Sequence, residues 1–235
     1  MNLKIAQLQL GEQPVVAGVL TDSDLSGITA EVRDSLDVVE LRVDMFDSVE
    51  TGHVADVFKK IRDLLGKPVI GTVRDAGEGG QRTIDDRLEL YDACIPWCDA
   101  VDVEVQSNRL LAKVGRLLSR KGKLLIGSYH NFNETPDEIF MDSIVSRGKE
   151  GGADIVKIAV TAKGRDDLLR LLLFTFRHRD KGMITMSMGD AGLPSRVVGP
   201  LFGSLISYGY VGRPSAPGQL SVSELMDLFR KLKLR

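Results

Sequence analysis

The chain has 235 residues, 43% of them hydrophobic, with 31 Lys and Arg side chains against 33 Asp and Glu. This length and apolar content suffice for one large core, so we expect a single domain over residues 1–235. The formal net charge of −2 gives no global field that would attract nucleic acid or an anionic membrane surface, and a small-molecule partner is expected. No apolar run approaches the length of a membrane span, and the N-terminal residues lack the apolar core of a signal peptide, which predicts a cytoplasmic protein.

Short apolar runs alternate along the chain with longer stretches of helical spacing. The predicted strands are 15–20, 38–43, 69–73, 100–105, 124–129, 154–159, 183–187 and 205–210. The predicted helices include 55–65, 83–95, 110–119, 136–150, 166–176 and 195–202. This alternation predicts an α/β protein with a parallel sheet, and its repeat count is that of a (β/α)8 TIM barrel.

Residues 3–10 are surplus to these repeats and are expected to form a short hairpin that closes the bottom of the barrel. A doubly wound open sheet is the alternative fold, although the Gly-x-Gly-x-x-Gly pattern is absent after the first strand. Two helix starts are marked by capping boxes. The first, Thr135-Pro136-Asp137-Glu138, also has proline at the expected first helical position, and the second is Ser221-Val222-Ser223-Glu224.

Lys157 lies in the middle of the apolar run 153–160. A run of this length and β-branched content is typical of a strand buried on both faces, where a solvated lysine does not belong. The lysine could snorkel at the strand end or neutralise a buried carboxylate. Alternatively, burial leaves part of the amine neutral and nucleophilic, as a Schiff-base enzyme requires.

Polar residues gather at the ends of the other predicted strands, where barrel enzymes place their chemistry. They are Glu40, Arg42 and Asp44; Arg74 and Glu78; Asp102 and Glu104; and Ser128 and His130. The seventh strand carries the apolar Met186 and Met188 at the corresponding place. Glu40 and Arg42 could form a structural ion pair on one strand face. Asp102 and Glu104 could be no more than polar residues of the barrel rim.

The three histidines and two cysteines differ in how well their positions suit a catalytic role. His53 and His178 fall in or beside predicted helices, which favours a solvated or helix-end role. His130 follows an apolar strand, and one histidine at the barrel mouth suits acid–base chemistry better than a His-rich metal site. Cys94 and Cys98 lack the C-x-x-C spacing and are expected to be reduced structural thiols.

Several motifs resemble the type I 3-dehydroquinate dehydratases and occur in that family's order over almost the whole chain. They are Glu40 to Asp44; Arg74 with Glu78-Gly79-Gly80; Ser128 to Phe132 with Thr135-Pro136; residues 153–159; Met186 to Gly189; Ser195-Arg196; Phe202-Gly203-Ser204; and Ser215-Ala216-Pro217-Gly218-Gln219. The histidine motif, the lysine motif and the Ser-Ala-Pro-Gly-Gln loop together are specific.

The resemblance implies dehydration of 3-dehydroquinate to 3-dehydroshikimate by syn elimination, the third step of the shikimate pathway, without metal or organic cofactor. It implies that Lys157 forms a Schiff base with the ring ketone, that His130 is the general acid and base, and that Glu78 orients His130. By the same resemblance Arg196 anchors the substrate carboxylate. The other substrate-binding positions that it implies are Glu40, Arg42, Arg74, Ser215 and Gln219.

The loop 211–218 is expected to close over the substrate, because its Gly and Pro residues bracket a segment without helical or strand periodicity. The predicted helix over 168–176 is more apolar than one core-facing stripe requires, which indicates a homodimer. Two rival functions stay open. A class I aldolase would use the same iminium to cleave a carbon–carbon bond, and a silent barrel would only bind a ligand or partner.

Overall fold

The computed structural model describes residues 3–212 and 219–235. Eight parallel strands form one sheet in the order β10-β3-β4-β5-β6-β7-β8-β9. Their bounds are β3 (Val15–Leu20), β4 (Val38–Arg42), β5 (Val69–Thr72), β6 (Ala100–Glu104), β7 (Leu124–Asn131), β8 (Ile155–Thr161), β9 (Met183–Met188) and β10 (Ile206–Tyr210). The two ends of the sheet meet where the Leu205 N–H donates to the Met183 carbonyl at 2.8 Å. The sheet is therefore a nearly closed barrel, as predicted.

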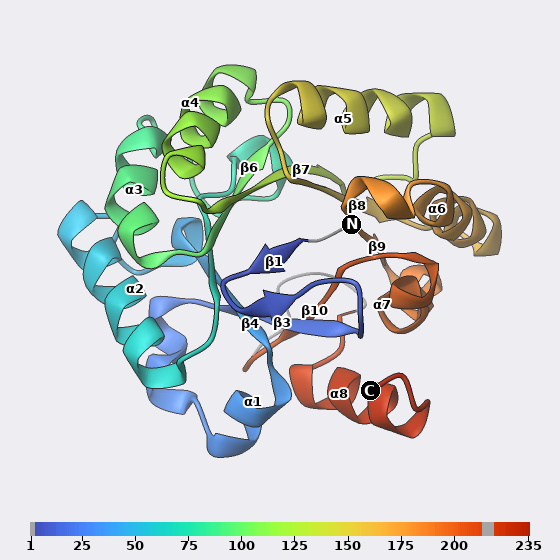
Figure 1. Cartoon of the computed structure of the whole chain (residues 1–235), viewed down its shortest axis with the longest axis horizontal. Helices are drawn as coiled ribbons and strands as arrows, with labels where there is room; N and C mark the ends of the chain where they lie inside the picture. Colours follow the sequence, from blue (N-terminus) through green and yellow to red (C-terminus); the bar gives the residue numbers. More distant parts are fainter. Residues whose placement is uncertain (1–2, 213–218) are drawn as a thin grey trace.

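Helices surround this barrel on its outer side (Figure 1). They are α1 (Ala30–Ser35), α2 (Thr51–Leu65), α3 (Arg87–Cys94), α4 (Asn108–Ser119), α5 (Glu138–Glu150), α6 (Arg165–Arg177), α7 (Pro194–Val198) and α8 (Val222–Lys231). Within the described residues, no helix is both long and apolar enough to cross a membrane. The predicted (β/α)8 architecture is confirmed, and the doubly wound alternative is wrong.

The predicted hairpin is formed by β1 (Lys4–Ile5) and β2 (Leu8–Gln9), which pair antiparallel. Ile5 and Leu10 are buried in the same apolar cluster as Val15 and Val38, which lie at the N-terminal ends of their strands. Figure 1 shows the hairpin across one end of the barrel. It closes the barrel bottom and leaves the opposite end for chemistry.

The barrel interior changes from apolar to polar along its axis. Val38, Ala100, Ile155 and Ile206 form a buried apolar layer from alternate strands near the hairpin. Two residues further along the same four strands stand Glu40, Asp102, Lys157 and Tyr208, which we call the polar layer. Because four alternate strands contribute each layer of such a barrel, this sequence pattern brings four chemically different groups to one level.

One of the two predicted helix caps is wrong. Helix α5 begins at Glu138, and its N-cap is Asp137, whose side chain accepts from the Phe140 N–H at 2.8 Å. Thr135 is buried instead and donates to the carbonyl of Thr161 at 2.9 Å. Asp137 outcompetes Thr135 because the threonine hydroxyl is already used to hold β8. The capping box at Ser221 is confirmed, with Ser221 N donating to Glu224 Oε2 at 2.8 Å.

Other boundaries also differ from the predictions. The predicted helix over 195–202 is α7 followed by a 3-10 turn over Gly199–Phe202, because Pro200 has no N–H for an α-helical bond. Helix α1 was not predicted. His178 caps the end of α6 as expected, but it is buried rather than solvated, and its Nε2 lies 2.7 Å from Asp142 Oδ1.

Gly71 of β5 packs directly against both cysteine sulfurs. A Cβ at this position would lie 2.7 Å from the Cys98 Sγ and 3.1 Å from the Cys94 Sγ, and both thiols are buried and free. We expect Gly71→Ala to lower the free energy of unfolding by about 1–3 kcal/mol, measured by urea denaturation. Gly52→Ala in α2, where a Cβ meets nothing within 4 Å, is the matched control. Equal stability of Gly71→Ala and the wild type would contradict the prediction.

Candidate active site

Lys157 is at the centre of the polar layer and is only 4% exposed. Its Nζ lies 3.1 Å from Glu40 Oε2 and 3.0 Å from Asp102 Oδ2. The same nitrogen lies 4.1 Å from the centre of the Tyr208 ring, a cation–π contact. The lysine therefore does neutralise buried carboxylates, as one interpretation of the sequence expected, and it also faces a cavity.

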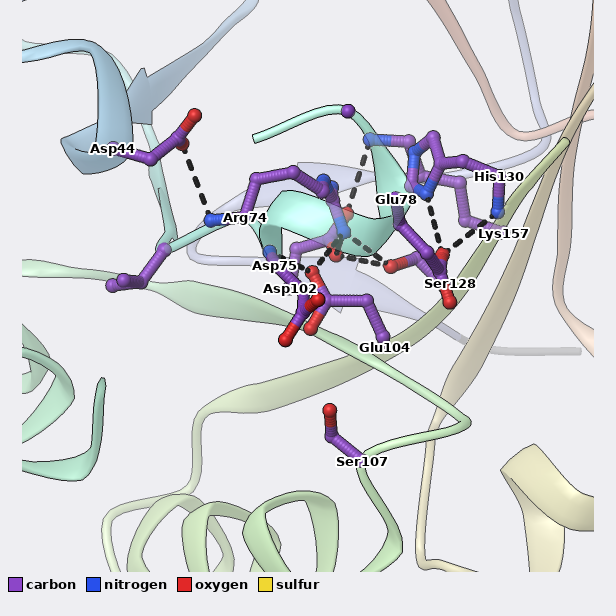
Figure 2. Close-up of polar contacts among 12 residues, drawn as sticks. Asp44, Arg74, Asp75, Glu78, Asp102, Glu104, Ser107, Ser128, His130 and Lys157 are labelled. Atoms are coloured by element: carbon purple, nitrogen blue, oxygen red, sulfur yellow. Dashed lines mark hydrogen bonds and ion pairs between the residues drawn. The ribbon is translucent and has the colours of Figure 1, made fainter. Parts of the chain in front are cut away.

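Arg74 contacts Asp102, one of the two carboxylates that pair with Lys157. Its Nη1 lies 3.0 Å from Asp102 Oδ1, 2.8 Å from Glu104 Oε1 and 2.7 Å from Ser128 Oγ. Figure 2 shows Arg74 reaching across toward Asp102 and Glu104. Burial alone would raise the pKa of Asp102, but the charges of Arg74 and Lys157 hold that pKa well below its ordinary value. Asp102 is thus a permanent anion.

Glu78 and His130 form a second pair at the cavity wall. His130 is on β7 and Glu78 ends the 3-10 turn that follows β5. Glu78 Oε2 accepts from the His130 backbone N–H at 2.8 Å and lies 3.1 Å from the ring Nδ1, as Figure 2 shows. Because this oxygen already acts as an acceptor, Nδ1 is assigned as the protonated nitrogen, and Nε2 keeps its lone pair.

The environment keeps both members of this pair uncharged near pH 7. Burial, and next the charge of Glu104, raise the pKa of Glu78 to about 8. Burial, followed by the charges of Arg74 and Lys157, lowers the pKa of His130 well below its ordinary value. A neutral imidazole with a free Nε2 is able to accept a proton, which is what a general base must do.

This pKa shift can be measured directly. We expect the ring carbon-13 signal of His130 to titrate with a midpoint below 6.5, because His130 is neutral at pH 7 and gains its proton only in more acidic solution. Nuclear magnetic resonance of labelled protein gives the titration. Comparison with His130→Ala assigns the signal among the three histidines. A midpoint at or above 6.5 would contradict the predicted environment.

Asp44 fixes the loop that carries Glu78. Its carboxylate receives two hydrogen bonds from Arg42, at 2.9 and 2.8 Å, and one each from the backbone N–H groups of Arg74 and Gln81. Arg42 therefore pairs with Asp44, and the predicted ion pair between Glu40 and Arg42 is wrong. Glu40 does not pair with Arg42 because Glu40 pairs with Lys157 and Arg42 pairs with Asp44.

A cavity of about 280 Å³ opens above the polar layer. Among the predicted site residues it is lined by Lys157, His130, Glu78, Glu40, Arg42, Arg74, Arg196 and Gln219. Met186, Met188, Tyr208 and Phe132 also line it. Thus residues that are widely separated in the sequence meet in one cavity. Ser215 and most of the predicted lid, 213–218, lie outside the described residues.

Arg196 is buried on α7 at the side of this cavity. Its Nη1 donates to the carbonyl of Tyr208 at 3.2 Å, and burial lowers the pKa of Arg196 to about 10. The guanidinium therefore stays charged at neutral pH in an apolar setting near the methionines. A charged, planar guanidinium in such a setting suits a carboxylate ligand, because it can donate two parallel hydrogen bonds. In the part of the chain that the structure describes, no group of three His, Cys, Asp or Glu residues is placed to hold a metal ion.

Comparison with known proteins decides the family. The family model for type I 3-dehydroquinase matches residues 16–234. The chain belongs to this family. It is 40% identical over 223 residues to the 3-dehydroquinate dehydratase of Thermodesulfovibrio yellowstonii, covering 94% of this chain and 97% of that protein. Membership makes the chain an enzyme of the hydro-lyase class.

Solved structures of relatives agree with this assignment. The 3-dehydroquinate dehydratase of Aquifex aeolicus is 35% identical and superposes with a TM-score of 0.83, covering 92% of this chain and 98% of that one. The type I 3-dehydroquinate dehydratase of Clostridium difficile, solved with covalently modified comenic acid, is 30% identical. Its TM-score is 0.87, and the match covers 97% of this chain and 96% of that one.

Proposed function

We propose that the chain dehydrates 3-dehydroquinate to 3-dehydroshikimate through a Schiff base on Lys157, as the third step of the shikimate pathway. The observation that carries the proposal is that Lys157 and the His130–Glu78 pair face one cavity. The names of the relatives supply the substrate. The covalently modified comenic acid in the Clostridium difficile relative supports covalent chemistry in the family.

The reaction begins when the neutral amine of Lys157 attacks the ring ketone and water leaves, which gives an iminium ion. The positive nitrogen withdraws electrons and acidifies the proton on the neighbouring carbon 2. His130 accepts that proton at Nε2 and returns one to the hydroxyl that departs from carbon 1 as water. Hydrolysis of the iminium releases the product and restores the amine. Because the lysine is the electron sink, the proposed reaction needs no metal or organic cofactor.

The remaining cavity residues would hold the substrate in place. Arg196 is proposed to bind the substrate carboxylate through its planar guanidinium group. Arg42, Arg74 and Glu40 would face the ring hydroxyls, together with Gln219. Ser215 is proposed as a further contact from the loop.

The two buried free thiols, Cys94 and Cys98, support the expected cytoplasmic location, since reducing compartments keep thiols unpaired.

The proposal is tested by incubating the protein with 3-dehydroquinate, following the conjugated product by ultraviolet absorbance, and quenching a parallel sample with borohydride. We expect turnover and a reduced adduct that peptide mass spectrometry maps to Lys157. Turnover without any adduct would contradict the Schiff base. Cleavage of phosphorylated substrates instead of dehydration would favour an aldolase, and neither reaction would favour a silent barrel.

We propose further that two copies of the chain form a dimer through α6. Leu171, Leu172 and Phe174 of this helix face the core, whereas Leu169 and Phe176 remain 54% and 47% exposed. A second copy would remove this apolar surface from water.

The dimer is tested with Leu173→Glu, which places a charge on the exposed face of α6, where Leu173 is 43% exposed. We expect sedimentation velocity to give a dimer for the wild type and a monomer for this variant. Leu64→Glu on α2, at a position of 50% exposure, is the matched control and should remain a dimer. A monomeric wild type would contradict the proposal.

A further inference from the structure

Two carboxylates contact the nitrogen of Lys157, and the proposed reaction needs a proton to leave and return there. An ammonium ion cannot attack a ketone, so one proton must move to a base first. The carbinolamine that then forms loses its hydroxyl as water only if an acid protonates it. Glu40 Oε2 at 3.1 Å and Asp102 Oδ2 at 3.0 Å are the two anions in direct contact with the amine.

Asp102 is unsuited to this proton exchange. Its other oxygen forms an ion pair with Arg74 Nη1 at 3.0 Å and accepts a hydrogen bond from Ser128 Oγ at 2.6 Å. It is fully buried on β6 and is not part of the cavity lining. Its absence from the cavity lining and its ion pairs with both Arg74 and Lys157 make it a counter-ion that holds Lys157 in place.

Glu40 differs from Asp102 both in its ion pairs and in its position relative to the cavity. Among the described residues its carboxylate forms an ion pair with Lys157 and with no other cation within 4.0 Å. It also lines the cavity, together with Lys157 itself. A carboxylate that faces both the amine and the ketone can take a proton from one and pass it to the other.

Two other groups that share the cavity with the amine are less suited to this exchange. Burial, and next the charge of Glu40, raise the pKa of Tyr208 well above its ordinary value, so the phenol does not act as a base near neutral pH. His130 is oriented by Glu78 through Nδ1 and is assigned to the proton on carbon 2. His130 can then serve the elimination while a different residue, Glu40, serves imine formation.

We propose that Glu40 is the acid–base residue of imine formation and that Asp102 is the fixed counter-ion of Lys157; this inference rests on the proposed Schiff-base reaction. Glu40 first takes a proton from the ammonium, which gives a neutral amine and a carboxylic acid. The amine adds to the ketone, and a proton passes from nitrogen to oxygen to form the carbinolamine. Glu40 then donates its proton to the carbinolamine hydroxyl, the carbon–oxygen bond breaks, and water and the iminium form. Hydrolysis of the product iminium runs these steps in reverse.

The test measures how fast the adduct forms at saturating 3-dehydroquinate, by rapid mixing, borohydride quench and intact-mass spectrometry. We expect Glu40→Gln, which keeps the shape but cannot accept the proton, to form the adduct at least about 100-fold more slowly than the wild type. Glu40→Asp keeps the acid and loses one methylene, and it should form the adduct about tenfold or more faster than Glu40→Gln. A role in shape or binding alone predicts the opposite order, since glutamine matches glutamate better in size.

The outcomes separate this inference from the proposed function. Absence of any adduct in the wild type would overturn both. An adduct in the wild type with an equal rate in Glu40→Gln, or a Glu40→Asp variant no faster than Glu40→Gln, would overturn only the role of Glu40. If Glu40→Gln does not fold, Glu40→Ala is measured in formate and in equal chloride. Faster adduct formation in formate supports the role, and equal rates overturn it.

Discussion

Replacement of Lys157 by alanine is expected to lower the turnover of 3-dehydroquinate by about 10⁴-fold or more, as removal of a covalent nucleophile does in other enzymes. Without the amine no iminium forms, so the proton on carbon 2 is no longer acidified and His130 has little to remove. Steady-state absorbance kinetics give the loss in kcat, and borohydride should trap no adduct.

The same substitution also has a cost in stability that must be measured alongside activity. Loss of the ammonium leaves Glu40 and Asp102 buried without their shared cation, which is expected to lower the free energy of unfolding by about 3–5 kcal/mol. Circular dichroism shows whether the variant is folded under the assay conditions. Lys163→Ala, at a lysine whose side chain is 66% exposed, is the control and should keep full activity. A folded Lys157→Ala that retains turnover would exclude the Schiff base.

His130→Ala is expected to lose turnover by about 10²–10⁴-fold, the usual contribution of a general acid and base. In contrast to the lysine variant, it should still give a borohydride-trapped adduct at Lys157. The reason is that the amine and its two carboxylates are unchanged, whereas the proton on carbon 2 no longer has an acceptor. The combination of lost turnover and retained adduct places His130 after imine formation.

The histidine experiment has an internal comparison. His53 lies on α2, where its Nε2 is 2.7 Å from Asp22, and it is not among the residues that line the cavity. His53→Ala should therefore keep the wild-type kcat within about twofold, since surface substitutions have small effects. If His130→Ala lost the adduct together with turnover, His130 would be needed for imine formation, and the separate role inferred for Glu40 would be in doubt.

The barrel and the polar residues at its strand ends could be predicted from the sequence because both follow from short-range patterns, whereas the roles of Arg196 and Gln219 were implied only by the resemblance to the family. Strand spacing sets the fold, and the parity of residues along a strand sets which side chains point inward. Lys157 stood out because a charge interrupted an apolar run. His130 stood out by its place at a strand end.

The partners of these residues were harder to predict, because they depend on which strands are neighbours in space. The spacing of Glu40 and Arg42 on one strand face allows an ion pair between them, whereas the barrel brings Glu40 to Lys157, 117 residues away. The sequence also allows Asp102 to be a rim residue, although it points to the same inner side of the barrel as Lys157. Tyr208 was missed, and the signal that could have found it is its position two residues after Ile206, at the level of the polar layer.

Among the described residues, the linked ion pairs around Lys157 and Arg74 balance in charge. Lys157, Arg74 and Arg87 supply three positive groups, and Glu40, Asp102 and Glu104 supply three negative ones. Any single replacement that changes charge leaves an unmatched ion in the interior, whereas a paired replacement does not. Over evolutionary time, these six positions should therefore change together or stay fixed, and engineering of this enzyme should vary them in compensating pairs.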